Sequence, residues 1–133
     1  MTTIKLARDK DSEFVRQVRN EVAAQSINYE YVSIHEHSVW WKKLKERGIK
    51  LYVIRYDNQK AGYIRINTHS RNEISIAIIK KYRDRGIGRK AMSLLPPEKY
   101  IAEIKTNNKA SLHFFKNIGF NVIDKVYILQ KGK

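Results

Sequence analysis

Two glycines lie in a strongly basic stretch in the second half of the chain. Gly86 and Gly88 are separated by one residue, and six of the eleven residues from Lys80 to Lys90 are Lys or Arg, against one acid, Asp84. Glycine lets a ligand approach the backbone closely, and the first amides of a helix have no intrahelical partner. Because the flanking sequence is typical of a strand before and a helix after, this loop could hold a diphosphate. The alternative is an ordinary glycine turn with a solvated basic surface.

A second segment begins twenty residues after Gly88, at Asn108. Taken alone, it predicts an amphipathic helix with Asn108 as its N-terminal cap and Gly119 as its terminator. The polar Ser111 and the apolar Phe115 are four residues apart, so they share one face of that helix.

Hydrophobic periodicity predicts the elements that must position these segments. Ser33 and Glu36 form a capping-box pattern at the start of one helix, and Pro96-Pro97 must end another. The predicted strands are 3–6, 51–56, 62–66, 73–79, 100–104, 120–123 and 126–129. The predicted helices are 14–22, one that begins at Ile34 and stops near Gly48, 87–95 and 109–117. This order predicts one α/β (α+β) domain over residues 1–133, with a mixed sheet covered by helices.

The paired motifs resemble the GNAT acetyltransferase superfamily. Arg83-x-x-Gly86-x-Gly88 matches its acyl-CoA signature, and Asn108-x-x-Ser111-x-x-Phe114-Phe115-x-x-x-Gly119-Phe120 is similar to its second conserved segment. The resemblance implies a GNAT-like mixed, mostly antiparallel sheet of about six to seven strands covered by about four helices. It also implies an acyltransferase that uses acetyl-CoA as co-substrate to acetylate a small-molecule primary amine, without a metal.

The resemblance implies roles for individual residues. Backbone amides of the glycine loop would bind the CoA diphosphate, and the strand Ile76-Ala77-Ile78 would pair with the pantetheine arm and stabilise the developing oxyanion. Asn108 and Ser111 would contact the same arm. The full set of cofactor-binding residues is Ile76, Ala77, Ile78, Arg83, Arg85, Gly86, Ile87, Gly88, Arg89, Lys90, Asn108, Ser111, Phe114 and Phe115.

Phe115 departs from the family pattern, which commonly has a tyrosine there to protonate the leaving thiolate. Phenylalanine has no such proton, and general acid help is typically worth about 10²–10⁴ in rate. Ser111, one helical turn earlier, is the candidate donor, with water as the alternative.

The attacking amine must lose a proton, so a base is expected. Glu73, at the start of the central strand, is the first choice because an acid at a strand end can reach an acceptor cleft. His37 and Glu36 are the alternatives, although capping explains Glu36 and a helix surface explains His37. The chain has no cysteine, which excludes an acyl-cysteine intermediate and favours direct attack.

Two features of the sequence bear on which amine accepts the acetyl group: the net charge and a resemblance over a short stretch. The net charge is +14, which favours a polyanionic partner: nucleic acid, an anionic membrane surface or a phosphorylated small molecule. The alternative is that the protein is simply basic. Arg19-Asn20 and the stretch Ile34 to Trp41 are similar to GNAT enzymes that acetylate a 4-amino sugar linked to UDP or dTDP in bacterial surface-glycan synthesis. The Trp40-Trp41 pair could stack on a base or sugar, or belong partly to the core.

Two other functions are compatible with the sequence. A protein or peptide amine acetyltransferase would share every CoA residue. A non-catalytic acyl-CoA or RNA binding module is the other. RNA-binding surfaces combine aromatic and basic side chains, and Tyr52, Tyr56 and Tyr63 with Arg55 and Arg65 could form one. RNA binding leaves both motifs unexplained. No apolar run approaches a membrane span or a signal peptide, so a cytoplasmic monomer or homodimer is expected.

Overall fold

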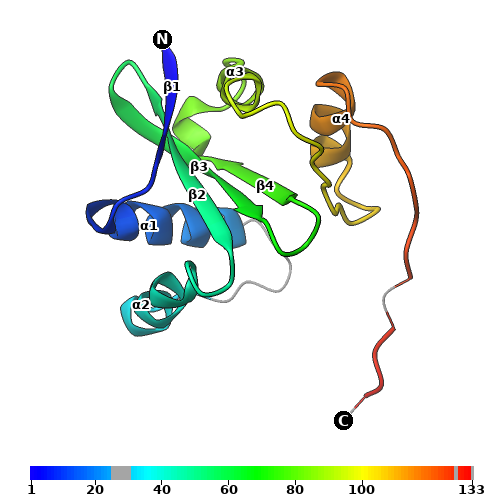
Figure 1. Ribbon diagram of the computed structural model, residues 1–133, viewed down its shortest axis with the longest axis horizontal. Helices are drawn as coiled ribbons and strands as arrows, with labels where there is room; N and C mark the ends of the chain where they lie inside the picture. Colours follow the sequence, from blue (N-terminus) through cyan, green and yellow to red (C-terminus); the bar gives the residue numbers. More distant parts are fainter. Residues whose placement is uncertain (25–30, 128, 133) are drawn as a thin grey trace. The chain divides into compact units, whose positions relative to one another are not determined.

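The computed structural model describes residues 1–24, 31–127 and 129–132. The chain forms two compact units, Met1–Glu103 and Ile104–Lys133. The first unit contains β1 (Thr2–Leu6), α1 (Ser12–Ala23), α2 (Ile34–Lys43), β2 (Ile49–Tyr56), β3 (Gln59–Asn67), β4 (Glu73–Ile78) and α3 (Ile87–Ser93). The second unit contains α4 (Lys109–Asn117). Figure 1 shows α1 and α2 on one side of the sheet and α3 on the other.

The sheet is antiparallel throughout, with the order β1-β2-β3-β4. Asp57 and Asn58 connect β2 to β3 with φ angles of 48° and 67°. Two left-handed residues give a tight turn whose twist matches that of the strands, and Asp and Asn tolerate this conformation. A register shift beyond Ile54 leaves Ala61 as an extra residue on β3. Such a bulge increases the local twist of the strand.

One face of the sheet is covered by α1 and α2. Val15 of α1 and Leu44, just after α2, form a buried cluster with Leu51 of β2, and Trp40, Trp41 and Tyr63 pack against it. Half of the predicted capping box at the start of α2 is confirmed, because the Ser33 hydroxyl accepts a hydrogen bond from the Glu36 N–H at 3.1 Å. The Glu36 carboxylate accepts from the Ser33 hydroxyl at 3.2 Å, and not from a backbone amide as the capping box predicts.

The predicted sheet of six to seven strands is wrong, because the described residues form four. The segment 100–104 is no strand: Ile101 forms a single parallel bridge with Glu73. Within the described part of 120–129, neither predicted strand forms; Ile128 lies outside it. A β-like sequence becomes a strand only when its backbone groups find a ladder partner. Val122, Ile123, Val126 and Tyr127 are instead 52 to 94% exposed.

The four helices of the described residues agree with the expected helix content. The helix predicted at 109–117 is confirmed in full, and α3 ends at Ser93, two residues before the predicted end. No helix within the described ranges has the length and apolar character needed to cross a bilayer.

Candidate functional site

Along β4, the main-chain N–H and C=O groups of successive residues point alternately toward β3 and away from it. The Ile79 N–H, just after the strand, donates to Ala61 O in β3 at 2.9 Å, whereas the Ile74 N–H donates to Ile101 O at 2.8 Å. In an antiparallel ladder, residues two apart point their N–H and C=O groups to the same side. The N–H groups of Ile76 and Ile78 therefore point away from β3, as the Ile74 N–H does.

This outer edge of β4 offers main-chain groups to a ligand. β4 is the last strand of the sheet, and beyond Ile74 no described residue of the first unit pairs with its outer edge. The Ile78 carbonyl accepts from Nε of Arg83 at 2.9 Å, while the N–H groups of Ile76 and Ile78 have no acceptor among the described residues. Ala77 pairs with Tyr63, so its own N–H and C=O turn toward β3.

The glycine loop leads from this strand into α3. Gly86 is the N-cap of α3 in the left-handed conformation, with φ 74°, and the first intrahelical bond runs from the Lys90 N–H to Gly86 O at 3.1 Å. Glycine supplies no capping side chain, so the amides of Ile87, Gly88 and Arg89 are left for another acceptor. A Cβ at Gly86 would meet nothing within 4 Å, so the described residues leave open space beside this position. Gly88 is buried in the first turn of α3.

Basic side chains of the loop gather around Tyr82, which is itself buried. Nζ of Lys81 lies 5.4 Å and Cζ of Arg85 lies 5.8 Å from the centre of the Tyr82 ring. The Lys80 N–H donates to the Glu21 carboxylate, which joins the end of α1 to the start of the loop. The basic loop is therefore positioned by the strand that it follows, by the hydrogen bond to Glu21 of α1 and by the Tyr82 ring.

His37 lies between α2 and α1 with both ring nitrogens engaged. Nδ1 is 3.0 Å from a guanidinium nitrogen of Arg19, and Nε2 is 3.1 Å from the Ser12 hydroxyl. Because arginine only donates, Nδ1 must accept and the imidazole is neutral. Burial lowers the pKa of His37, and the Arg19 charge lowers it further. His37 is therefore suited to hold Arg19 in place, and its basic nitrogen is already occupied.

The two tryptophans of α2 have different partners. The Arg19 guanidinium stacks on Trp40, with Cζ 4.1 Å from the ring centre, and Trp41 Nε1 donates to the Asp9 carboxylate at 3.0 Å. Both rings are half-buried against the core cluster. Each tryptophan is thus partly a core residue. Trp40 also makes a cation–π contact with the Arg19 guanidinium.

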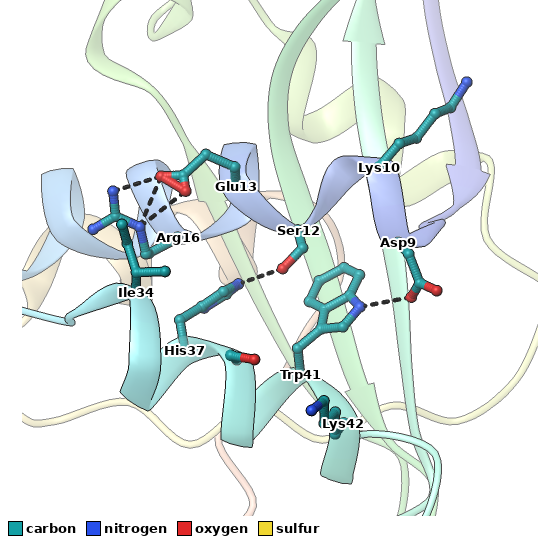
Figure 2. Close-up of a pocket in the computed structure, with 10 residues that line it drawn as sticks. Asp9, Lys10, Ser12, Glu13, Arg16, Ile34, His37, Trp41 and Lys42 are labelled. Carbon is teal, nitrogen blue, oxygen red and sulfur yellow. Dashed lines mark hydrogen bonds and ion pairs between the residues drawn. The ribbon is translucent and has the colours of Figure 1, made fainter.

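A hollow of about 430 Å³ opens between the start of α1 and α2 (Figure 2). Its wall includes Ser12, Glu13, Arg16, His37 and Trp41. Ser12 and Glu21 are nine residues apart on α1, about 14 Å along a helix, and it is Glu21 that contacts the glycine loop. Of the residues proposed from sequence, His37 and Trp41 line this hollow, whereas none of the predicted cofactor-binding residues does. The hollow is therefore a feature apart from β4 and its loop.

Glu73 is the first residue of β4, opposite Asn67 of β3. Its N–H donates to Ser70 O at 2.9 Å. Alternation places its side chain on the same face as Ser75 and Ala77, which is the face covered by α1 and α2. Glu36, the alternative base, is exposed and engaged in the capping of α2.

The second unit positions the remaining predicted residues around α4. The Asn108 side-chain oxygen accepts from the Ser111 N–H at 3.1 Å and so caps the helix. Phe115 is buried, with its ring centre 5.2 Å from that of Phe114 and 5.0 Å from that of Phe120. This aromatic cluster is a local core, in which Phe115 packs rather than presents a polar group.

Comparison with known proteins identifies the family. The profile of the Acetyltransferase (GNAT) domain matches residues 47–122, more than half of the chain, and includes β4, the glycine loop and α4. The chain belongs to the GNAT acetyltransferase family. This protein is accordingly an N-acetyltransferase that uses acetyl-CoA, and the family assignment disfavours a non-catalytic binding module.

Solved structures share the GNAT fold at low identity. A putative acetyltransferase from Salmonella typhimurium, solved with acetyl-CoA, has a TM-score of 0.76 at 21% identity, covering 93% of this chain and 82% of that one. A ribosomal-protein-alanine N-acetyltransferase from Brucella melitensis has a TM-score of 0.74 at 20% identity, with coverage of 90% and 84%. The aminoglycoside N-acetyltransferase AAC(6')-Iy, solved with CoA, has a TM-score of 0.76 at 13% identity, with coverage of 98% and 95%. No curated protein sequence matches the chain significantly.

The first unit of this GNAT protein brings together β4, the glycine loop and the end of α1. Sequence reasoning did not find Glu21, and it considered Arg65 only as part of an RNA-binding surface. The alternation of the strand 62–66 carried a usable signal, because a charged residue two positions from a tyrosine must share its face.

Proposed function

We propose that this GNAT enzyme transfers the acetyl group of acetyl-CoA directly to the amine of a nucleotide-linked 4-amino sugar. The observation that carries the transfer chemistry is the outer edge of β4, where the N–H groups of Ile76 and Ile78 point away from β3 and the glycine loop follows at once.

The proposed binding of acetyl-CoA uses this edge and the loop. The backbone amides of Arg85, Gly86, Gly88 and Arg89 hold the diphosphate, supported by the positive end of α3. The pantetheine arm lies along β4. The family resemblance implies that Asn108 and Ser111 also contact this arm. An N–H group of the β4 edge donates to the thioester carbonyl oxygen, which stabilises the negative charge that develops there.

The proposed transfer needs two proton movements. Glu73 accepts a proton from the amine, which attacks the thioester carbonyl carbon; the carbon–nitrogen bond forms and the carbon–sulfur bond breaks. Ser111 donates a proton to the leaving thiolate, since Phe115 has none to give. The thiol pKa of about 8.5 makes this donation helpful rather than indispensable.

The proposed acceptor rests on charge, on aromatic residues and on resemblance. A protein with a net charge of +14 favours an acceptor that carries phosphate. Arg19, stacked on Trp40, provides a cation and an aromatic surface on the helices that cover the sheet. The fold does not choose the acceptor, since structures with this fold include both an aminoglycoside and a ribosomal-protein-alanine acetyltransferase.

A thiol-release assay tests the proposal. Acetyl-CoA is supplied with UDP- and dTDP-linked 4-amino sugars, with polyamines and with lysine peptides, and free CoA is measured. Faster release with the amino sugar nucleotides is expected. Release with polyamines or peptides but none with the nucleotides would reject the acceptor while leaving the acetyltransferase assignment in place.

A further inference from the structure

Tyr63 and Arg65 project from β3 toward α1 and α2. Tyr63 packs against the cluster of Val15, Leu44 and Leu51, so its side chain lies on the helix-covered face. Side chains two apart on a strand share a face, which places Arg65 on the same side. Both side chains are half-buried.

Arg19 reaches the same region from α1. Its guanidinium is held by Nδ1 of His37 at 3.0 Å and by stacking on Trp40, which fixes its direction. Burial raises the pKa of the Tyr63 phenol, and the charges of Arg65 and Arg19 oppose that rise. Burial lowers the pKa of Arg19, and the like charge of Arg65 adds to the effect. The two guanidinium groups therefore act on the same phenol and on each other.

Neither arginine has a carboxylate partner among the described residues. The arginine ion pairs within those ranges join Arg16 to Glu13 and Arg55 to Asp11. Glu36 acts on Arg19 only as a more distant charge. Two partly desolvated like charges without a counter-ion are unfavourable, and a bound anion would relieve that cost. Arginine also presents a planar set of donors that matches phosphate oxygens.

The neighbouring positions on β4 carry small side chains on this face. Arg65 pairs with Ser75, and Tyr63 pairs with Ala77, both of them small. The opposite face of β4 carries Ile74, Ile76 and Ile78 instead. The small side chains lie beside the residues whose N–H groups point to the outer edge, so a ligand on this face is close to the thioester position proposed above.

We propose that Arg19 and Arg65, with the Tyr63 hydroxyl as a further donor, form the subsite that binds the diphosphate of the acceptor nucleotide. This inference rests on the proposed function. It separates two diphosphate sites on one chain: main-chain amides of the glycine loop for CoA, and side-chain guanidinium groups on the helix-covered face of β3 for the acceptor.

The test measures UDP binding by calorimetry with CoA present at saturation, so that the glycine loop is already occupied. The proteins are the unaltered chain, Arg65→Met, Arg65→Lys and, as a matched control, Arg47→Met at an exposed arginine. We expect Arg65→Met to weaken UDP binding roughly ten- to a hundredfold, Arg65→Lys to weaken it less, and Arg47→Met to leave it unchanged. Inorganic diphosphate should show the same dependence on Arg65, because the phosphate groups carry the recognition.

Binding of UDP that is as tight in Arg65→Met as in the unaltered chain would overturn the subsite, as would a failure of the unaltered chain to bind UDP. A retained rise of the melting temperature with CoA shows that Arg65→Met is folded. If amino sugar nucleotides are acetylated but Arg65→Met leaves their KM unchanged, only this subsite is wrong. If no amino sugar nucleotide is acetylated while another amine is, the proposed acceptor is wrong instead.

Discussion

Nζ of Lys60 on β3 lies 2.7 Å from Oδ1 of Asp11, a buried carboxylate at the start of α1. The Arg8 N–H donates to Oδ2 at 2.8 Å, and Arg55 lies 3.6 Å from Oδ1. Burial would raise the pKa of Asp11, but the Arg8 hydrogen bond and the Lys60 charge outweigh it, so the pKa is lowered. The charged carboxylate thus joins α1 to the β2–β3 hairpin.

Asp11→Asn removes this charge while keeping the shape of the side chain. We expect a loss of about 1.5–3 kcal/mol in the free energy of unfolding, the usual contribution of hydrogen bonds to a charged group. Urea denaturation measures it, with Glu46→Gln at an exposed acid as the control. Equal stability of Asp11→Asn and the unaltered chain would show that the cost of burying the carboxylate cancels its interactions.

The pH dependence of stability should report on His37. Its pKa is lowered from the ordinary value of 6.5 by burial and by Arg19, so below that value the unfolded chain binds a proton that the folded chain does not. Stability must then fall as the pH falls below about 6.5, by at most about 1.4 kcal/mol per pH unit. The pKa of Asp11 is lowered from 3.8, so protonation of this carboxylate affects stability only at a lower pH than His37 does.

Melting temperatures between pH 7.5 and 5 measure this effect. His37→Gln should flatten the slope, whereas His35→Gln, at an exposed position on the same helix, should keep it. A slope that is the same in His37→Gln and the unaltered chain would assign the acid sensitivity to other groups.

Gly86→Leu should abolish the rise in melting temperature that acetyl-CoA causes. A side chain at this N-cap stands next to the first amides of α3, where the diphosphate is proposed to bind, and the left-handed φ of 74° adds strain. Asn58→Leu, at a left-handed turn residue with φ 67°, is the control for strain alone. If acetyl-CoA still raises the melting temperature of Gly86→Leu, the glycine loop is not part of the cofactor site.

Glu73→Gln tests the proposed base. We expect kcat to fall by about 10²–10⁴, while the stabilisation by acetyl-CoA is retained because the proposal gives Glu73 a contact with the amine and none with the cofactor. The measurement is kcat against pH with the acceptor found by thiol release. Glu36→Gln serves as the comparison, and a loss there in place of Glu73→Gln would move the base to α2.

Ser111→Ala and Phe115→Tyr together test the proton donor. Ser111→Ala should lower kcat, and Phe115→Tyr should keep or raise it in both the unaltered chain and the Ser111→Ala background. The tyrosine hydroxyl supplies the proton that phenylalanine lacks. A large loss in Phe115→Tyr would mean that the ring packing among Phe114 and Phe120 does not tolerate a hydroxyl.

Much of the local structure was predictable from the chain itself. Helix boundaries at Ser33 and Asn108 follow from caps that satisfy nearby amides, and the turn at Asp57-Asn58 follows from residues that tolerate a left-handed backbone. The strand count was not predictable in this way. Residues such as Val122 and Ile123 have β-like sequences, but whether a distant segment supplies a ladder partner is not encoded in their own pattern.

The sequence alone indicated the family and the position of the glycine loop. Gly86, Gly88 and the segment from Asn108 form short motifs, whose local structure depends on residues only a few positions away. Only the tertiary structure decided that His37 is a neutral support for Arg19, and that Arg19 and Arg65 act on one phenol from α1 and β3. Protonation state and partnership depend on burial and on charges from segments far apart in the chain, and these exist only once α1 and α2 pack on the sheet.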